Sequence, residues 1–152
     1  MSFDIALFDT RSRSESGVDF PILNPKSGLP FLDNEGKPVT ITLLGRNSDA
    51  FRSVQREAQK READRQARGV VRDDEEQRRE VFDYLVAITK GWSFDALSGE
   101  PFAFNPANVR RLWIDGRWEW LRTQMFNHCL QEGNFLALPL PGSSGGPSNS
   151  SA

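Results

Sequence analysis

The sequence has very few of the residues that enzymes use for covalent chemistry and proton transfer. Its 152 residues include one cysteine, one histidine and one tyrosine. A single cysteine excludes a disulfide within the chain and fits a reducing cytosol. His128 and Cys129 are adjacent on a predicted helix, so their side chains diverge by about 100°, which is poor geometry for a Cys–His pair. We therefore expect no catalytic residues and a non-enzymatic protein.

Long apolar runs and a strong charge imbalance are also missing. No segment approaches the roughly 20 apolar residues of a membrane span. The first ten residues lack the basic start of a signal peptide. The 19 Lys and Arg residues nearly balance the 21 Asp and Glu residues, so nothing favours general attraction to nucleic acid or anionic membrane. We expect a cytoplasmic protein with neither nucleic acid nor a membrane as its partner.

Sequence motifs for cofactors and metals do not occur. We find no phosphate-binding loop, dinucleotide-binding glycine pattern, HExxH or CxxC. The acidic cluster "DDEE" (73–76) is the strongest candidate for a metal site, but consecutive helical residues point in different directions. Acidic residues at the start of a helix are also favoured by the helix dipole. We predict no cofactor and no metal-ligating residue.

The first 46 residues predict a small antiparallel β segment. The stretch "VDFPIL" (18–23) alternates imperfectly, and Pro21 suits an edge strand. The stretch "VTITLLGR" (39–46) alternates β-branched residues and is the clearest strand. Between them lie two turn-forming stretches, 24–28 and 33–38, rich in Asn, Asp, Pro and Gly.

The following residues, 47–138, predict the helical part of the same domain. Asn47 or Ser48 can cap a helix that runs to about Arg68. The charged stretch 59–72 allows two interpretations, a solvated helix or a disordered connector. Further helices are predicted at three places, and their ranges are 77–90, 105–113 and 118–134.

The whole pattern predicts an α+β fold with a β segment first and helices after it. We expect one domain over residues 1–138. The last residues, 139–152, contain almost nothing to bury and predict a flexible Gly/Ser/Pro tail.

Aromatic residues make up 11% of the chain and are dense towards its C-terminal half. Trp118 and Trp120 are two positions apart on a predicted helix, so both cannot face one core. Leaving a tryptophan exposed loses burial free energy unless a partner covers it, and tryptophan is enriched at interaction hot spots. We predict that four residues form a partner-binding face: Trp113, Trp118, Trp120 and Phe135. Trp92 and Phe104 are predicted instead to pack as a local core.

Two long stretches, "YLVAITKGWSFDALSGEPFAFNPANVRRLW" and "RWEWLRTQMFNHCLQEGNFL", resemble the tail assembly chaperones of long-tailed (siphovirus-like) bacteriophages. The shared features are a Thr–x–Gly–Trp step after a helix, a "G-x-P-F-x-F" patch, an "N-x-x-x-L" step and a closing "N-F-L". In this chain they are Thr89, Gly91, Trp92, Gly99, Pro101, Phe102, Phe104, Asn108, Leu112, Asn134, Phe135 and Leu136.

The resemblance implies a chaperone that binds the tape measure protein and keeps it soluble until tail tube subunits polymerise around it. It implies self-association, and displacement of the chaperone so that it is absent from the mature virion. Many members also yield a longer product by ribosomal frameshifting, which recruits the major tail tube protein. The alternative interpretation is a structural tail or head–tail connector component that stays in the virion.

Overall fold

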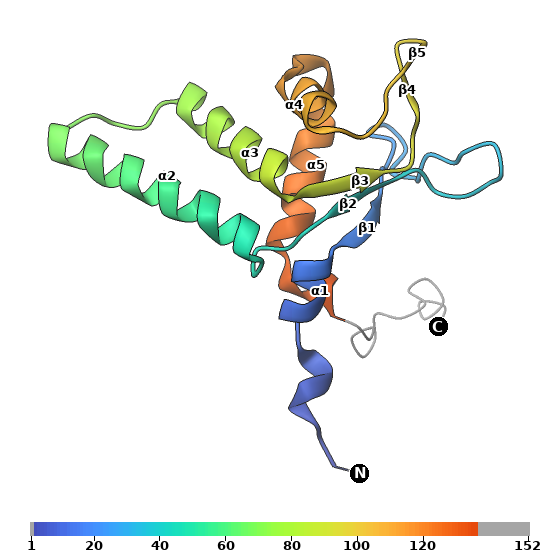
Figure 1. Cartoon of the computed structure of the whole chain (residues 1–152), viewed down its shortest axis with the longest axis horizontal. Helices are drawn as coiled ribbons and strands as arrows, with labels where there is room; N and C mark the ends of the chain where they lie inside the picture. The colour runs from blue at the N-terminus through green and yellow to red at the C-terminus, as the bar shows by residue number, and fades with distance from the viewer. Residues whose placement is uncertain (1, 137–152) are drawn as a thin grey trace.

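A computed structural model describes residues 2–136 of this chain (Figure 1). Two short helices come first, a 3-10 helix over Ile5–Phe8 and α1 over Arg11–Ser16. The other elements, in order, are β1 (Val18–Pro21), β2 (Thr40–Leu43), α2 (Asp49–Arg68), α3 (Asp74–Ile88), β3 (Thr89–Trp92), β4 (Ala96–Leu97), β5 (Glu100–Pro101), α4 (Pro106–Ile114), a 3-10 turn (Gly116–Trp118), α5 (Glu119–Leu130) and a 3-10 turn (Glu132–Phe135). The predicted α+β class is confirmed, and the predicted tail at 139–152 lies outside the described residues.

The main sheet has three antiparallel strands in the order β1-β2-β3. Phe20 of β1 lies opposite Ile41 of β2, which in turn lies opposite Trp92 of β3. The third strand comes from residues 89–92, where the sequence predicts the end of a helix and a turn. The helix ends at Ile88 because Thr89 is already extended and its N–H donates the last helical bond to the Leu85 carbonyl.

The connection between β1 and β2 folds back on itself and projects from the sheet (Figure 1). Isolated bridges pair Leu23 with Pro30 and Leu32 with Pro38. On α5, the amide of Gln124 accepts from the Leu23 N–H at 2.8 Å and donates to the Leu23 carbonyl at 3.0 Å. The side chain of Gln124 therefore hydrogen-bonds both backbone groups of Leu23, as a neighbouring strand would.

Capping residues in the sequence determine where the helices begin and end. Ser48 accepts from the Phe51 N–H at the start of α2, and Gly69 ends α2 with a left-handed φ of 71°. Asp73 and Asn105 cap α3 and α4 in the same way. The charged stretch 59–72 therefore forms helix as far as Arg68. Of the helices within residues 2–136, none is both long and apolar enough to cross a membrane.

One hydrophobic core joins the inner side of the sheet to α3, α4 and α5. The sheet contributes alternate residues, such as Ile41 and Leu43 of β2, and the helices contribute Leu85, Leu112 and Met125. α2 adds little to this core, because its buried residues are spaced one every seven positions and include a charged one: Phe51, Ala58 and Arg65. Figure 1 shows α2 lying beside α3 with its far side open.

The short helix α1 has no clear signal in the sequence, and tertiary contacts hold it in place. The Ser14 carbonyl accepts from the Gly45 N–H at 3.0 Å, and the Ser14 hydroxyl accepts from the Asn47 N–H at 3.1 Å. A side chain at position 45 would meet both Ser14 and Phe135, since a Cβ there would lie 3.0 Å from Phe135 Cε2. Only glycine allows α1 and the C-terminal turn to approach the chain this closely.

We predict that Gly45→Ala destabilises the protein, because the added methyl group overpacks a buried contact between three segments. Overpacking of this kind costs about 1–3 kcal/mol. Chemical denaturation measures the loss. Gly116→Ala is the matched control, since nothing lies within 4 Å of a Cβ at that position. Equal stability of the two variants would show that the Gly45 contact is not tight.

Candidate functional site

Two of the four predicted partner-binding residues lie in the core. Trp113 and Phe135 are 0% and 1% exposed. The Trp113 Nε1–H donates to the Thr89 hydroxyl at 3.1 Å, and the Phe135 ring meets Phe20 edge to face at 5.6 Å. The prediction that these two rings form an exposed face is therefore wrong. Their partners come from segments far away in the sequence.

The other two predicted residues, Trp118 and Trp120, are half-buried against the rim of the core. The Arg117 guanidinium lies 5.3 Å from the Trp118 ring centre. Trp120 lies beside Phe31 of the β1–β2 connection, with 6.3 Å between the ring centres. Trp120 and the β1–β2 connection therefore form one continuous surface.

The aromatic residues after β3 form a stack of nearly parallel rings. Trp92 lies against Phe94 at 5.0 Å and against Phe102 at 5.3 Å, with interplanar angles of 12° and 9°. Phe102 is the buried member. Trp92 is half-buried, with its Nε1–H donating to the Phe102 carbonyl. Phe104 packs edge-on against Trp92 but is 40% exposed, so the prediction that it belongs to a local core is wrong.

His128 and Cys129 are placed in separate environments. The His128 ring stacks on Phe20 at 4.7 Å, and its Nε2 is buried without a hydrogen-bond partner among the described residues. Cys129 is fully buried, and this burial raises the pKa of its thiol to about 12. A thiol with such a pKa holds almost no thiolate at neutral pH, and thiolate is the form that acts as nucleophile.

The acidic cluster at 73–76 serves the helix and its neighbour. The Asp73 carboxylate accepts from the Glu76 N–H at 2.9 Å, as a helix cap does. Glu76 forms an ion pair with Arg65 of α2 at 3.1 Å. In the part of the chain that the structure describes, no His, Cys, Asp and Glu side chains gather as metal ligands would.

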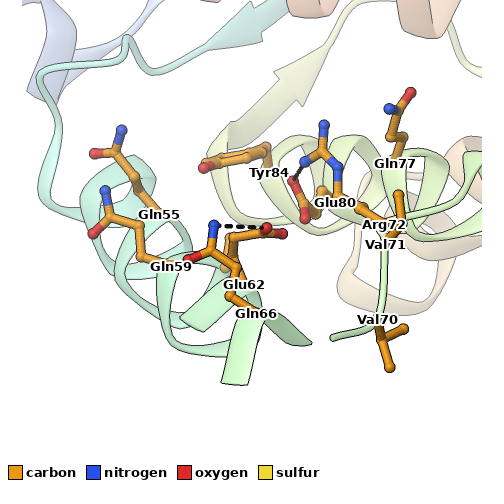
Figure 2. A pocket seen from close by; sticks show the side chains of 11 residues that line it. Gln55, Gln59, Glu62, Gln66, Val70, Val71, Arg72, Gln77, Glu80 and Tyr84 are labelled. Carbon is orange, nitrogen blue, oxygen red and sulfur yellow. Dashed lines mark hydrogen bonds and ion pairs between the residues drawn. The ribbon is translucent and has the colours of Figure 1, made fainter. Parts of the chain in front are cut away.

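A groove of about 660 Å³ lies between α2 and α3 near their connection (Figure 2). The Gln55 and Gln59 side chains line it on α2, and the Tyr84 ring lines it on α3. Arg65, only 7% exposed, pairs with carboxylates of both helices: Glu62, Glu76 and Glu80. These ion pairs join the ends of the two helices beside the groove.

Large apolar side chains are exposed on segments that project from the body. The N-terminal segment has four, which are Phe3, Ile5, Leu7 and Phe8. The β1–β2 connection has Leu29, Phe31 and Leu32, and the α2–α3 connection has Val70 and Val71. Sequence reasoning missed the first two groups, although four apolar residues within the first eight positions were a visible signal.

Comparison of this chain with protein families, with curated protein sequences and with solved structures gave no match. The function therefore has to be inferred from the arrangement of its own side chains. That arrangement offers exposed apolar and aromatic groups on projecting segments. Such groups suit the binding of another polypeptide.

We predict that the protein loses stability as the pH falls below about 6.5. Burial lowers the pKa of His128 from its ordinary value of 6.5, so the unfolded chain binds a proton before the folded chain does. The free energy of unfolding therefore decreases from pH 6.5 down to the folded pKa, and is independent of this group above that range.

Urea denaturation at several pH values measures the effect, and His128→Gln should remove it. Glutamine keeps a polar side chain of similar length but does not titrate. If the variant shows the same pH dependence as the natural sequence, His128 is not its cause.

Proposed function

We propose that this chain is a non-enzymatic tail assembly chaperone of a long-tailed bacteriophage. It binds the tape measure protein and keeps it soluble while the tail tube assembles. The observation that carries the proposal is the exposure of apolar side chains on projecting segments (Figure 1). A long client with apolar helices needs an extended surface of this kind, and such recognition uses apolar anchors rather than a reaction centre.

The client surface that we propose is the loop patch, defined as Leu29, Phe31, Leu32 and Trp120. Three of its residues are exposed on the β1–β2 connection, and Phe31 lies beside Trp120 of α5. The connection is held by the Gln124 bonds to Leu23 and by a turn in which the Asn24 side chain accepts from the Lys26 N–H. An apolar surface held in a fixed shape loses less conformational entropy when it binds.

Charged helical surface is the second feature that suits a solubilising role. α2 is 20 residues long and presents many charged side chains to solvent, with exposed ion pairs such as Arg68–Asp64 at 2.8 Å. Isolated exposed pairs contribute little to stability. They keep the surface hydrated, so a complex between the chaperone and an apolar client can stay in solution.

The proposal has four further parts. The chaperone acts in the host cytoplasm, associates with itself and is absent from the mature virion. A frameshift-extended form recruits the major tail tube protein to the client. The predicted tail, 139–152, is a natural junction for that extension and lies outside the described residues.

We predict that Phe31→Ala with Trp120→Ala reduces the soluble fraction of the tape measure protein when the two proteins are produced together. The paired change removes the aromatic part of the loop patch, and each lost anchor weakens binding by about 1–2 kcal/mol or more. The soluble and pelleted fractions of the tape measure protein are compared by quantitative gel analysis.

Phe104→Ala is the matched control, since Phe104 is an exposed aromatic residue outside the loop patch. Thermal unfolding of each variant alone shows whether its fold is retained. A folded double variant that keeps the client soluble would reject the loop patch as the client surface. If the natural chain itself does not keep the client soluble, the chaperone function is rejected.

A second prediction separates the chaperone from a structural tail or connector component. An antibody against residues 1–46 should detect the chain in lysate of phage-producing cells, with a fainter and longer companion. Neither band should be present in purified particles, because an assembly factor is displaced before the particle is complete. Persistence of the chain in particles would favour the structural component instead.

A further inference from the structure

The N-terminal arm, residues 3–8, displays apolar side chains that nothing in the described part of the chain covers. Its four large apolar residues are between 37% and 73% exposed. The arm is nevertheless regular, because the Asp4 carboxylate accepts from the Ala6 N–H at 3.0 Å and the Phe3 and Phe8 rings stack at 5.5 Å. Exposed apolar groups on an ordered segment favour a second surface that buries them.

The base of the arm is fixed to the body by α1. Arg11 forms an ion pair with Asp49 at 2.9 Å, and the Asn47 side chain donates to the Thr10 hydroxyl at 3.0 Å. These contacts hold the arm so that it extends away from the helices and the sheet (Figure 1). The arm therefore cannot fold back over the top of its own chain while α1 stays in place.

A groove that suits the arm runs along α3 between α2 and α4. We call it the α3 groove; it consists of two adjoining hollows of about 870 and 420 Å³ that share Asp83 and Arg110. Its apolar side chains are partly exposed and come from all three helices: Val54, Phe82, Val86, Ala87 and Ile114. Ile114 alone is 67% exposed.

The charges of the arm and of the groove are complementary where the two hollows meet. The arm and its flank carry Asp4 and Asp9, with no basic side chain between them. Arg110 lies at the junction of the hollows and forms no ion pair with any residue in the range 2–136, whereas the neighbouring Asp83 pairs with Arg61. Asp73 and Glu75, which form no ion pair within residues 2–136, lie at the far end of the groove, at the start of α3.

The arm extends below α1 in Figure 1, whereas α3 and α4, which line the α3 groove, lie above α1. We propose that the N-terminal arm of one copy of this chain binds in the α3 groove of a second copy. The contact joins two different surfaces, so it builds either a two-fold pair in which the copies exchange arms, or a ring or open chain of repeated copies. This inference does not depend on the identity of the client.

Two single variants test the contact, and each removes one side of it. Leu7→Asp places a charge on the arm, and Ile114→Asp places one in the α3 groove; both replaced side chains are exposed, so the fold is retained. Each change should weaken self-association by about tenfold or more, as expected from losing the burial of one aliphatic side chain. Sedimentation equilibrium of the full chain over a range of concentrations measures the association. Val71→Asp, which changes an 87% exposed residue on the α2–α3 connection, is the matched control.

Mixing the two variants gives the decisive result. The Leu7→Asp chain keeps an intact groove and the Ile114→Asp chain keeps an intact arm, so an equimolar mixture should form a one-to-one dimer. That dimer cannot grow, because its remaining arm and groove are both altered. If the Leu7→Asp variant does not fold, a variant that lacks residues 2–8 is used in its place.

Three outcomes overturn the proposal. The first is a natural chain that stays monomeric at every concentration, which would leave the arm for a different partner such as the client. The second is self-association that survives both changes. The third is a mixture of the two variants that contains monomers alone.

Discussion

The hydrogen bond from the Trp113 indole to the Thr89 hydroxyl lies where helix α3 becomes strand β3, in the middle of the core. The same hydroxyl donates to the Leu85 carbonyl of α3. One threonine therefore ends a helix, begins the third strand of the sheet and receives a side chain from α4. The position of α4 beside α3 depends on this junction, and the α3 groove lies between these two helices and α2. A fully buried indole needs a partner for its N–H, and the junction supplies it.

The sequence predicted the elements whose signals are local. Helix α2 begins after Ser48 and ends at Arg68, as predicted, and α4 begins at Pro106, within the predicted range 105–113. Helix α3 covers Asp74–Ile88 and not the predicted 77–90, because the Asp73 side chain caps it and Thr89 is already extended. The charged stretch 59–72 was open to two interpretations. It forms helix to Arg68 because its basic and acidic side chains pair with each other and with those of α3.

The sequence could not predict features that depend on distant partners. α1 is held by the turn around Gly45, and β3 pairs with a strand some 50 residues earlier. The spacing of Trp118 and Trp120 on a helix suggested an exposed face, to which Trp113 was added. Trp113 instead packs in the core, where Thr89 and Arg122 bind its N–H and its carbonyl. Half of the predicted partner face is thus core, and the N-terminal arm and the β1–β2 connection carry seven of the exposed large apolar side chains.

The amide of Gln124 has a consequence for how the protein meets other chains. Both backbone groups of Leu23 are bonded by that amide, so a foreign strand cannot add at this position without first displacing a side chain of α5. Unprotected strand edges are where sheets of different molecules fuse. A protein that exposes so much apolar surface in a crowded cell is at risk of such fusion. Gln124 therefore blocks strand addition at Leu23. Another protein that binds at this point has to contact side chains, because the backbone hydrogen-bonding groups are already occupied.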